Sequence, residues 1–507
     1  MKKFILAILA LILCSGGKIL AQNKTEVISY ITGKIENRNS TDSVILMLNG
    51  PFTMYGGASE ANASKIFTEK PDQNGVFKFK IRTENSPFHF TLFQSNKRLP
   101  SGNLISSGDV KNYLIEPGDS INVKFEGAKQ TYSGRGAKLF EAQLKIAEVD
   151  PDDKQLMSSV HNYFNIDTKK WLNQKDSLLN AQLQVLNSCK TDMSPMAYGI
   201  IRADIIGKNR TFIYRRISFA GPFFVSGEPL KKEIQDLCIE LQNRPAYLDK
   251  EDRSALTPEY ILYLYNKIRT EVKYQRIINQ IDPFIDENYF DAINSEYTGL
   301  VRDKLLTYWL TSIAAFNHLD EKYLSNALSV MVSPTFVQMV NNLKETFSSG
   351  QPVSDFDFQN AKGQRVRLSD FQGKVVVIDL WFTGCGPCLN VARGLRQVEK
   401  QFANRKDVKF VSISRDQNKS MWLNSIDQSQ RSKPTSYFIS NDTEYLYTSG
   451  TGANNSFIKR YVPQESYPCL LLIDKKGRIF TSTPSQPISV EGMEKLTLEI
   501  NQAVSHQ

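Results

Sequence analysis

The stretch WFTGCGPC, residues 381–388, decides how the last third of the chain folds. It follows the apolar run VVVIDL at 375–380 and precedes a segment with helical periodicity at 387–402. A helix that begins here places Cys385 at its N-terminus, where free backbone N–H groups and the helix dipole stabilise a thiolate. Thiol pKa values in Cys-X-X-Cys motifs fall to roughly 3.5–7.5. The spacing therefore predicts a redox pair with Cys385 as the nucleophile.

The neighbours of Cys385 fit the same chemistry. Pro387 suits the first turn of a helix because its missing N–H is not needed there, and Gly386 lets the backbone of a substrate come close. Cys388, one turn deeper, is placed to attack a mixed disulfide on Cys385 and release the substrate. Asp379 interrupts the apolar strand, and we expect it to accept the proton of Cys388; a hydrogen-bonded aspartate with a structural role is the alternative.

The segments around this motif indicate an α/β domain. Expected strands at 375–381, 408–414, 469–473 and 479–481 are interspersed with expected helices at 387–402, 419–426, 455–461 and 490–504. Strands that alternate with helices favour a parallel sheet, because parallel neighbours need a crossover connection. The residues DKKG at 474–477 predict a hairpin turn, so the last two strands should be antiparallel.

Three ordered elements from about Pro352 to the C-terminus resemble the thioredoxin superfamily, and within it the secreted bacterial TlpA/ResA-like thiol–disulfide oxidoreductases. They are LSDFQGK at 368–374, CGPC at 385–388 and YPCLLLID at 467–474. The resemblance implies a Cys385–Cys388 disulfide. It also implies that Pro468 is a cis-proline facing the cysteines and that the Tyr467 backbone pairs with an extended substrate segment.

The substrate surface should differ from that of a general thioredoxin. Gly384 stands where thioredoxins usually have Trp, which removes an aromatic wall and alters the choice of partner. Cys469, directly after Pro468, is either an inert packing thiol or a third redox-active sulfur. The residues that we expect to contact substrate are Trp381, Gly384, Gly386, Pro387, Tyr467 and Pro468.

The expected function is exchange of the Cys385–Cys388 pair with protein thiols and disulfides, with no cofactor. The CGPC sequence resembles the reducing members of the family, and a reductant outside the cytoplasm needs a membrane thiol-reducing transporter as electron donor. Oxidised apocytochrome c cysteines are one concrete target. A disulfide isomerase or oxidase is one alternative, and a surface ligand-binding protein with a supporting thioredoxin-like domain is another.

Other classes of site have little support. The chain has four His, none close to another His or to Cys, and there is no second CxxC to complete a zinc site, so no metal is expected. A peroxidase of the peroxiredoxin type would not use a CxxC pair. The formal charge of +9 is spread along the sequence without a basic block, so no nucleic-acid partner is expected.

The remaining two thirds of the 507 residues predict three further parts. Residues 1–21 have a basic start and an apolar run at 4–14, as in a secretory signal cleaved near Ala21, which predicts a periplasmic or secreted protein. Lipid anchoring at Cys14 is the alternative, although Leu13 stands where that signal normally has a small residue. Alternating apolar residues predict an antiparallel β-sandwich at 22–130, helical periodicity predicts an all-α linker domain at 131–348, and the thioredoxin-like domain occupies 349–507. Cys189 and Cys238 could pair or remain buried thiols.

Overall fold

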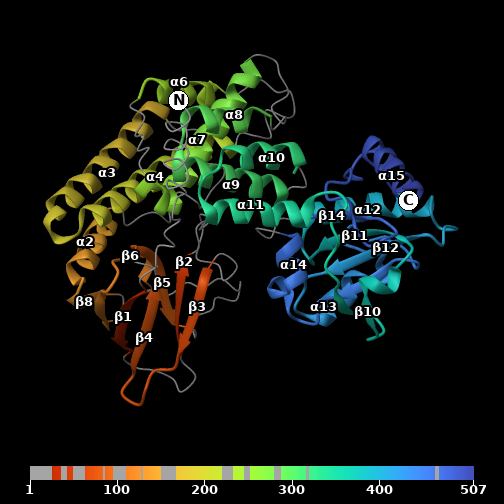
Figure 1. Cartoon of the computed structure of the whole chain (residues 1–507), viewed down its shortest axis with the longest axis horizontal. Helices are drawn as coiled ribbons and strands as arrows, with labels where there is room; N and C mark the ends of the chain where they lie inside the picture. The colour runs from red at the N-terminus through yellow and green to blue at the C-terminus, as the bar shows by residue number, and fades with distance from the viewer. Residues whose placement is uncertain are drawn as a thin grey trace, which may run out of the picture. The chain divides into compact units, whose positions relative to one another are not determined.

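The computed structural model (Figure 1) describes residues 26–35, 43–49, 63–83, 86–94, 110–126, 129–149, 167–219, 232–244, 252–278, 287–315, 319–462 and 467–506. The predicted signal segment and Cys14 lie outside the described residues. Contacts between residues divide the chain into two compact units. One consists of residues 1–49, 64–151 and 184–201, and the other of residues 50–63, 152–183 and 202–507.

The N-terminal β domain contains two four-stranded sheets with the orders β4-β1-β7-β8 and β3-β2-β5-β6. Its strands are β1 Val27–Lys34, β2 Val44–Asn49, β3 Ala63–Glu69, β4 Val76–Thr83, β5 Phe88–Gln94, β6 Val110–Ile115, β7 Ser120–Glu126 and β8 Lys129–Arg135. Within β4, Phe77, Phe79 and Ile81 are buried while the residues between them are exposed, so the period of two predicted from the sequence is present.

Two features of this domain differ from the prediction. The strands β1 and β7 are parallel, so the domain is not purely antiparallel. Five other strands lie between them in the sequence, and this long connection lets β7 start beside the start of β1 and run in the same direction. Strand β8 also extends past the boundary predicted at residue 130. The sequence hides this strand because the described side chains of residues 131–135 are exposed apart from that of Tyr132.

Helix α2, Ala137–Glu148, closes the β domain with an aromatic contact. The Phe140 ring on α2 lies 5.8 Å from the Phe90 ring of β5, 5.9 Å from the Tyr113 ring of β6 and 5.2 Å from the Tyr132 ring of β8. Rings from both sheets therefore pack against one helical side chain.

The middle of the chain is helical, as predicted. Its helices are α3 Thr168–Ser188, α4 Pro195–Phe219, α6 Lys232–Gln242, α7 Pro258–Ile278, α8 Glu287–Glu296, α9 Gly299–Ala315, α10 Glu321–Val330 and α11 Pro334–Phe347. Tyr260 and Trp309 are fully buried, which makes them packing residues. Cys189 and Cys238 are buried free thiols, so they form no disulfide with each other. Among the described residues, no helix is long and apolar enough to cross a bilayer.

The C-terminal domain is built on a seven-stranded sheet of order β10-β9-β13-β12-β11-β14-β15. Its elements are β9 Asp357–Asn360, β10 Arg365–Arg367, β11 Val375–Trp381, α12 Gly386–Lys400, β12 Val408–Ser414, α13 Lys419–Ser425, β13 Glu444–Tyr447, α14 Ser456–Tyr461, β14 Cys469–Ile473, β15 Ile479–Thr481 and α15 Val490–Ser505. Helices α12 and α15 share one buried core with the strands, which includes Val377, Leu395 and Ile500.

The sheet is mixed and not parallel throughout. Strands β11, β12 and β13 are parallel, whereas β14 is antiparallel to β11, with Cys469 opposite Leu380. Strand β14 therefore begins at the edge of the sheet where β11 and β13 end. The chain between β13 and β14 does not have to return to the opposite edge. This register brings the start of β14 next to the end of β11 and to the motif that follows it.

Candidate active site at the dithiol

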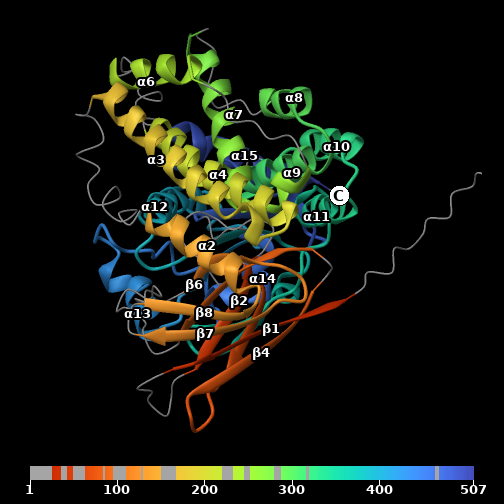
Figure 2. The same ribbon diagram turned by 90° about the vertical axis from the view of Figure 1, so that its left-hand side faces the viewer.

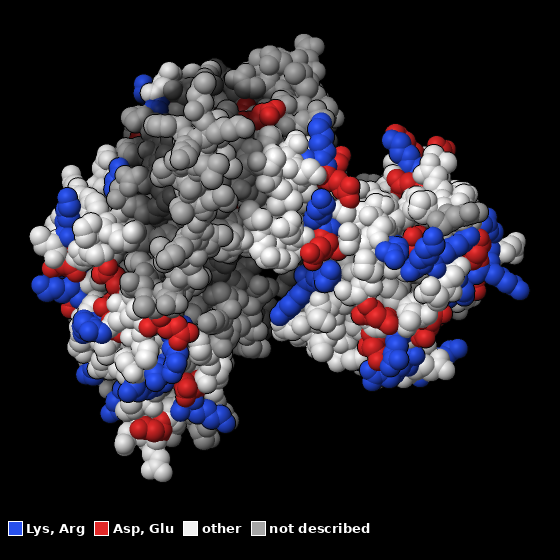
Figure 3. Space-filling model, viewed as in Figure 1, with Lys and Arg blue, Asp and Glu red and all other residues white. Residues whose placement is uncertain are grey.

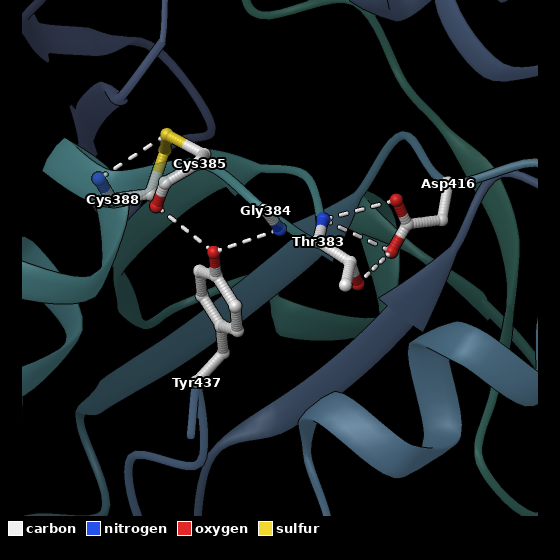
Figure 4. The surroundings of a disulfide bond; sticks show 6 residues. All are labelled: Thr383, Gly384, Cys385, Cys388, Asp416 and Tyr437. Atoms are coloured by element: carbon white, nitrogen blue, oxygen red, sulfur yellow. Dashed lines mark hydrogen bonds between the residues drawn. A yellow bond between two sulfur atoms is a disulfide. The ribbon is translucent and has the colours of Figure 1, made fainter. Parts of the chain in front are cut away.

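Cys385 and Cys388 lie where β11 gives way to α12, and they form a disulfide (Figure 4). Cys385 is the N-cap of α12, and its Sγ accepts a hydrogen bond of 3.2 Å from the Cys388 N–H. This donor is one of the N–H groups that a helix leaves unpaired at its start. Cys385 is 5% exposed and Cys388 is fully buried, so an incoming sulfur can reach only Cys385. This asymmetry favours Cys385 as the sulfur that a client would meet first.

Tyr437, a residue that the sequence analysis missed, holds the loop before Cys385. Its hydroxyl accepts a hydrogen bond of 3.1 Å from the Gly384 N–H and donates one of 2.9 Å to the Cys385 carbonyl (Figure 4). Its ring stacks on Trp381 with centroids 4.1 Å apart. Trp381 in turn donates from Nε1 to the Ser412 hydroxyl at 2.8 Å. A stacked pair of rings therefore supports the dithiol loop from the interior.

This packing corrects the role predicted for Trp381. The side chain is fully buried between Tyr437 and the sheet, so it does not form part of the surface that a substrate would touch. All seven residues of β11 are buried. Sequence reasoning assigned Trp381 to the surface because it stands next to the motif, but the continuous burial of the strand includes its last residue.

A second anchor holds the other side of the loop. Asp416 accepts hydrogen bonds from the Thr383 N–H at 3.0 Å and from the Thr383 hydroxyl at 2.6 Å (Figure 4). The Thr383 hydroxyl also lies 2.8 Å from that of Ser425. Asp416 follows the carboxyl end of β12, the edge where α/β sheets place functional residues. That position is the sequence signal that could have identified it.

The accessible surface around Cys385 is formed by residues with little or no side chain. Gly384 and Gly386 are exposed, and a Cβ atom added to either would meet nothing within 4 Å. Gly384 has φ +96°, a conformation that favours glycine. Pro387 is exposed as well, and Pro468 is half-buried, with the Tyr467-Pro468 peptide bond in the cis form that the resemblance implied.

A cationic and aromatic cluster borders this open surface. The Arg415 guanidinium lies 4.5 Å from the centre of the Phe382 ring and 5.2 Å from that of Tyr467. The two rings meet edge to face at 5.3 Å. All three side chains are half-buried, and they come from the motif loop, the end of β12 and the cis-proline loop. Contacts of this kind between a guanidinium and aromatic faces are attractive and fix the positions of the rings.

Asp379 lies in the middle of β11, opposite Ser412 on one side and Leu470 on the other. It is buried, and no described residue hydrogen-bonds its Oδ1 atom. Burial raises the pKa of the Asp379 carboxyl to about 7. A carboxyl group with this pKa can take up and release a proton near neutral pH.

Cys469 is buried beside the start of β14, and its Sγ donates a hydrogen bond of 3.4 Å to the Tyr461 carbonyl. Burial, and to a lesser extent the charge of Asp379, raises the pKa of this thiol to about 12. A neutral thiol is a weak nucleophile. The surroundings of Cys469 therefore favour the packing role over that of a third redox-active sulfur. Among the described residues, no group of three or more His, Cys, Asp or Glu side chains could hold a metal ion.

Comparison with known proteins adds family information for this domain. Residues 349–482 match the AhpC/TSA family. The thiol-disulfide oxidoreductase ResA of Oceanobacillus iheyensis is 25% identical over 142 residues, which is 27% of this chain and 73% of that protein. ResA of Bacillus subtilis is 30% identical over 76 residues, 15% of this chain and 42% of that protein. The thioredoxin-like protein YneN of Bacillus subtilis is 29% identical over 80 residues, which is 14% of this chain and 47% of that protein. The chain therefore spans about half the length of this relative.

Solved structures of thiol-disulfide oxidoreductases match about 30% of this chain. The thioredoxin domain of a thiol-disulfide oxidoreductase from Bacteroides vulgatus is 20% identical, and the match covers 31% of this chain and 98% of that structure with a TM-score of 0.25. A thiol-disulfide oxidoreductase from Bacteroides fragilis is also 20% identical, with 30% and 98% covered and a TM-score of 0.24.

Proposed function

We propose that the whole chain is a thiol–disulfide oxidoreductase that acts outside the cytoplasm, with a C-terminal domain of the TlpA/ResA-like group of the thioredoxin superfamily. The observation that carries the proposal is the placement of the disulfide. Cys385 caps α12, is the more accessible of the two cysteines and adjoins an open surface next to the cis-proline Pro468. An extended segment of a client protein could lie on this surface with its sulfur against Cys385.

In the reducing direction, the Cys385 thiolate attacks one sulfur of a client disulfide. A bond forms between Cys385 and that sulfur, the client S–S bond breaks, and the other client sulfur leaves as a thiolate that takes up a proton. Cys388 then loses its proton to Asp379 and attacks Cys385 Sγ, the bond between Cys385 and the client sulfur breaks, and that sulfur leaves as a thiolate that takes up a proton. The client leaves with two thiols, and the enzyme retains the two sulfurs as the disulfide seen in the structure. Two electrons have passed to the client.

The direction of exchange forms a further part of the proposal. We assign the chain as a reductant, resupplied by a membrane thiol-reducing transporter, with apocytochrome c cysteines as candidate clients in cytochrome c maturation. Equilibration of the pair against dithiothreitol or glutathione buffers tests the assignment. A potential near or below about −250 mV supports a reductase, whereas a value near about −120 mV would identify an oxidant.

The activity itself is tested by insulin reduction with wild type and the Cys385→Ser variant. We expect turnover by the wild type and none by the variant, because Cys388 is fully buried and cannot replace Cys385 as nucleophile. The Cys469→Ser variant is the matched control, since it removes a buried thiol outside the disulfide. Equal turnover by wild type and Cys385→Ser would leave the ligand-binding alternative.

Client identity is tested by trapping. The Cys388→Ser variant lacks the resolving sulfur, so a client should stay attached to Cys385 and be recovered by mass spectrometry. Clients with reducible cysteine pairs in the periplasm support the proposal. Capture of proteins with non-native disulfides only would favour the isomerase alternative.

A further inference from the structure

The segment 426–443 leads from α13 to β13 and carries Tyr437, whose hydroxyl holds the loop before Cys385. Residues 436–440 of this segment belong to no helix or strand, although residues 436–439 are buried. A buried backbone carbonyl needs a hydrogen-bond partner, and outside a sheet that partner has to come from another part of the fold. Figure 2 shows the helix α13, which precedes the segment, and the helix α12, which supplies the partners.

Arg396 of α12 donates the hydrogen bonds that this segment needs. Its Nε atom donates to the Phe438 carbonyl, and its Nη2 atom donates to the Ser436 carbonyl at 2.6 Å. These two residues flank Tyr437. The Nη1 atom donates to the Arg431 carbonyl at 3.3 Å. Because a guanidinium is planar and presents its donors in a rigid fork, Arg396 fixes the backbone on both sides of Tyr437.

This use of a guanidinium differs from that of the surface arginines of the same domain. On the surface of the C-terminal domain seen in Figure 3, basic and acidic side chains are interspersed. Arg405, for example, pairs with Asp407 at 2.8 Å. Arg396 is half-buried, and burial lowers its pKa with no carboxylate of the described residues opposing the shift. Burial of a charge is costly unless hydrogen bonds compensate for the lost water, and here the compensation comes from the carbonyls beside Tyr437.

The Tyr437 hydroxyl acts on the residue that caps α12. It donates to the Cys385 carbonyl, which also accepts a helical hydrogen bond from the Leu389 N–H at 3.3 Å. With this backbone fixed, Cys385 Sγ stays beside the Cys388 N–H, which is 3.2 Å away in the disulfide form. A hydrogen bond to a thiolate is stronger than one to a neutral sulfur, because the acceptor is charged. The Tyr437 hydroxyl therefore stabilises the reduced, ionised pair more than it stabilises the disulfide.

We propose that Arg396 is a positioning residue of the redox pair, which holds Tyr437 where its hydroxyl fixes Cys385. Arg396 lies about three helical turns beyond Cys385, a distance of about 16 Å along the helix axis. This distance exceeds the Debye length of about 8 Å at physiological salt, so the charge itself has little direct effect on the sulfur. The inference rests on the proposed function, because it concerns the same disulfide.

The test measures the equilibrium of the full chain with glutathione, in which the dithiol and glutathione disulfide give the protein disulfide and two glutathione thiols. Acid quenching, alkylation and mass spectrometry of the peptide with residues 385 and 388 quantify the two forms of this pair alone. Arg396→Gln should shift the equilibrium constant towards the disulfide about fivefold, because hydrogen bonds to a charged and to a neutral acceptor differ by about 1 kcal/mol. A role in stability alone would weaken both redox forms alike and leave this constant unchanged.

The matched control is Arg393→Gln on the same helix. Arg393 is exposed and donates to the Pro434 carbonyl at 2.8 Å, which lies outside the pair of carbonyls that flank Tyr437. This variant removes the same charge at a position nearer to the disulfide, and its equilibrium constant should stay within twofold of wild type. Arg396→Lys keeps the charge but not the planar fork, so its constant should lie between those of wild type and Arg396→Gln. It takes the place of Arg396→Gln if that variant does not fold.

Combined substitutions test the route through Tyr437. Tyr437→Phe should shift the equilibrium constant in the same direction by at least as much as Arg396→Gln. The double variant Arg396→Gln/Tyr437→Phe should agree with Tyr437→Phe within twofold, because the arginine then has no hydroxyl to position. Independent effects would multiply to about 25-fold.

Three results would overturn the proposal. The first is a shift in Arg396→Gln no larger than that in Arg393→Gln. The second is a double variant in which the two effects multiply. The third is an Arg396→Lys variant equal to wild type, which would assign the effect to the charge. If wild type exchanges with glutathione and reduces insulin while one of these results holds, only the role of Arg396 fails. A wild type that does not exchange with glutathione would refute the proposed function as well.

Discussion

Replacement of Asp379 by Asn should stabilise the C-terminal domain at alkaline pH, and the stabilisation should shrink steadily as the pH falls towards 4. In the folded protein, burial raises the pKa of this carboxyl from 3.8 to about 7. The folded state therefore binds the proton more tightly than the unfolded state does, and stability falls as the pH rises between these two values. Asparagine has nearly the same shape as protonated aspartate and cannot ionise.

The size of the effect follows from the shift in pKa. Each pKa unit corresponds to about 1.36 kcal/mol, so a shift of about three units destabilises the ionised protein by about 4 kcal/mol at pH 8. At pH 5 the folded carboxyl is still protonated and the loss is about 1.5 kcal/mol. Between pH 5 and pH 8 the difference in stability between Asp379→Asn and wild type should therefore grow by about 2 to 3 kcal/mol.

Amide hydrogen exchange in the oxidised full chain measures this difference locally. Peptides that cover β11 report the opening free energy of the sheet around residue 379, and the intact disulfide prevents titration of Cys385 and Cys388. Measurement of wild type and variant at each pH cancels the contributions of other titrating groups. If the two proteins differ by the same free energy at pH 5 and pH 8, the raised pKa is wrong as an explanation of this site.

The catalytic role of Asp379 has a separate pH signature. If the carboxyl accepts the proton of Cys388, release of a client from the mixed disulfide should accelerate as pH rises through about 7 in wild type. The Asp379→Asn variant should release the client more slowly and lose this inflection. A rate with the same inflection in the variant would favour the structural role for Asp379.

Three other substitutions probe the surroundings of the disulfide. Tyr437→Phe removes two hydrogen bonds to the dithiol loop, so it should lower the free energy of unfolding by about 1–3 kcal/mol and slow insulin reduction. Tyr447→Phe is the control: its ring stacks on Trp422 in a similar way and loses one hydrogen bond to Gln417, and the rate of insulin reduction should stay unchanged. Gly384→Trp should cost about 1–3 kcal/mol in thermal unfolding because of its φ of +96°. Cys469→Ala should keep the rate of insulin reduction within twofold of wild type, and a large loss would favour Cys469 as a third redox-active sulfur.

The secondary structure around the site was predictable where strands are buried on both faces. The ends of β11, β12 and β14 agree with the expected strands at 375–381, 408–414 and 469–473, because strands buried on both faces are rich in β-branched and other apolar residues over their whole length. Strands β9, β10 and β13 were missed. They have three or four residues, and the edge strand β10 and its neighbour β9 are largely polar, so no periodicity marks them.

The residues that support the site were harder to predict than the pair that reacts. Cys385 and Cys388 are three positions apart, so the motif shows them directly. Tyr437 is 52 residues from Cys385, and Asp416 is 33 residues from Thr383. The position of Asp416 after a strand end could have marked it as a candidate, but only the register of the sheet and the loops beyond it show which residue it contacts, and Tyr437 has no local signal at all. The mistaken role of Trp381 has a local origin, because the burial of β11 extends to its last residue, next to the motif.

The choice of client should depend on the cluster of Phe382, Arg415 and Tyr467 more than on Gly384. A glycine with open space above it removes contacts but cannot distinguish one client from another. The cluster, by contrast, offers two aromatic faces and a guanidinium beside the cis-proline Pro468. An Arg415→Ala change removes the charge and loosens both rings, so it should raise KM for clients with acidic residues next to the cysteine. The kcat should change little, because the guanidinium takes no part in the exchange between the sulfurs.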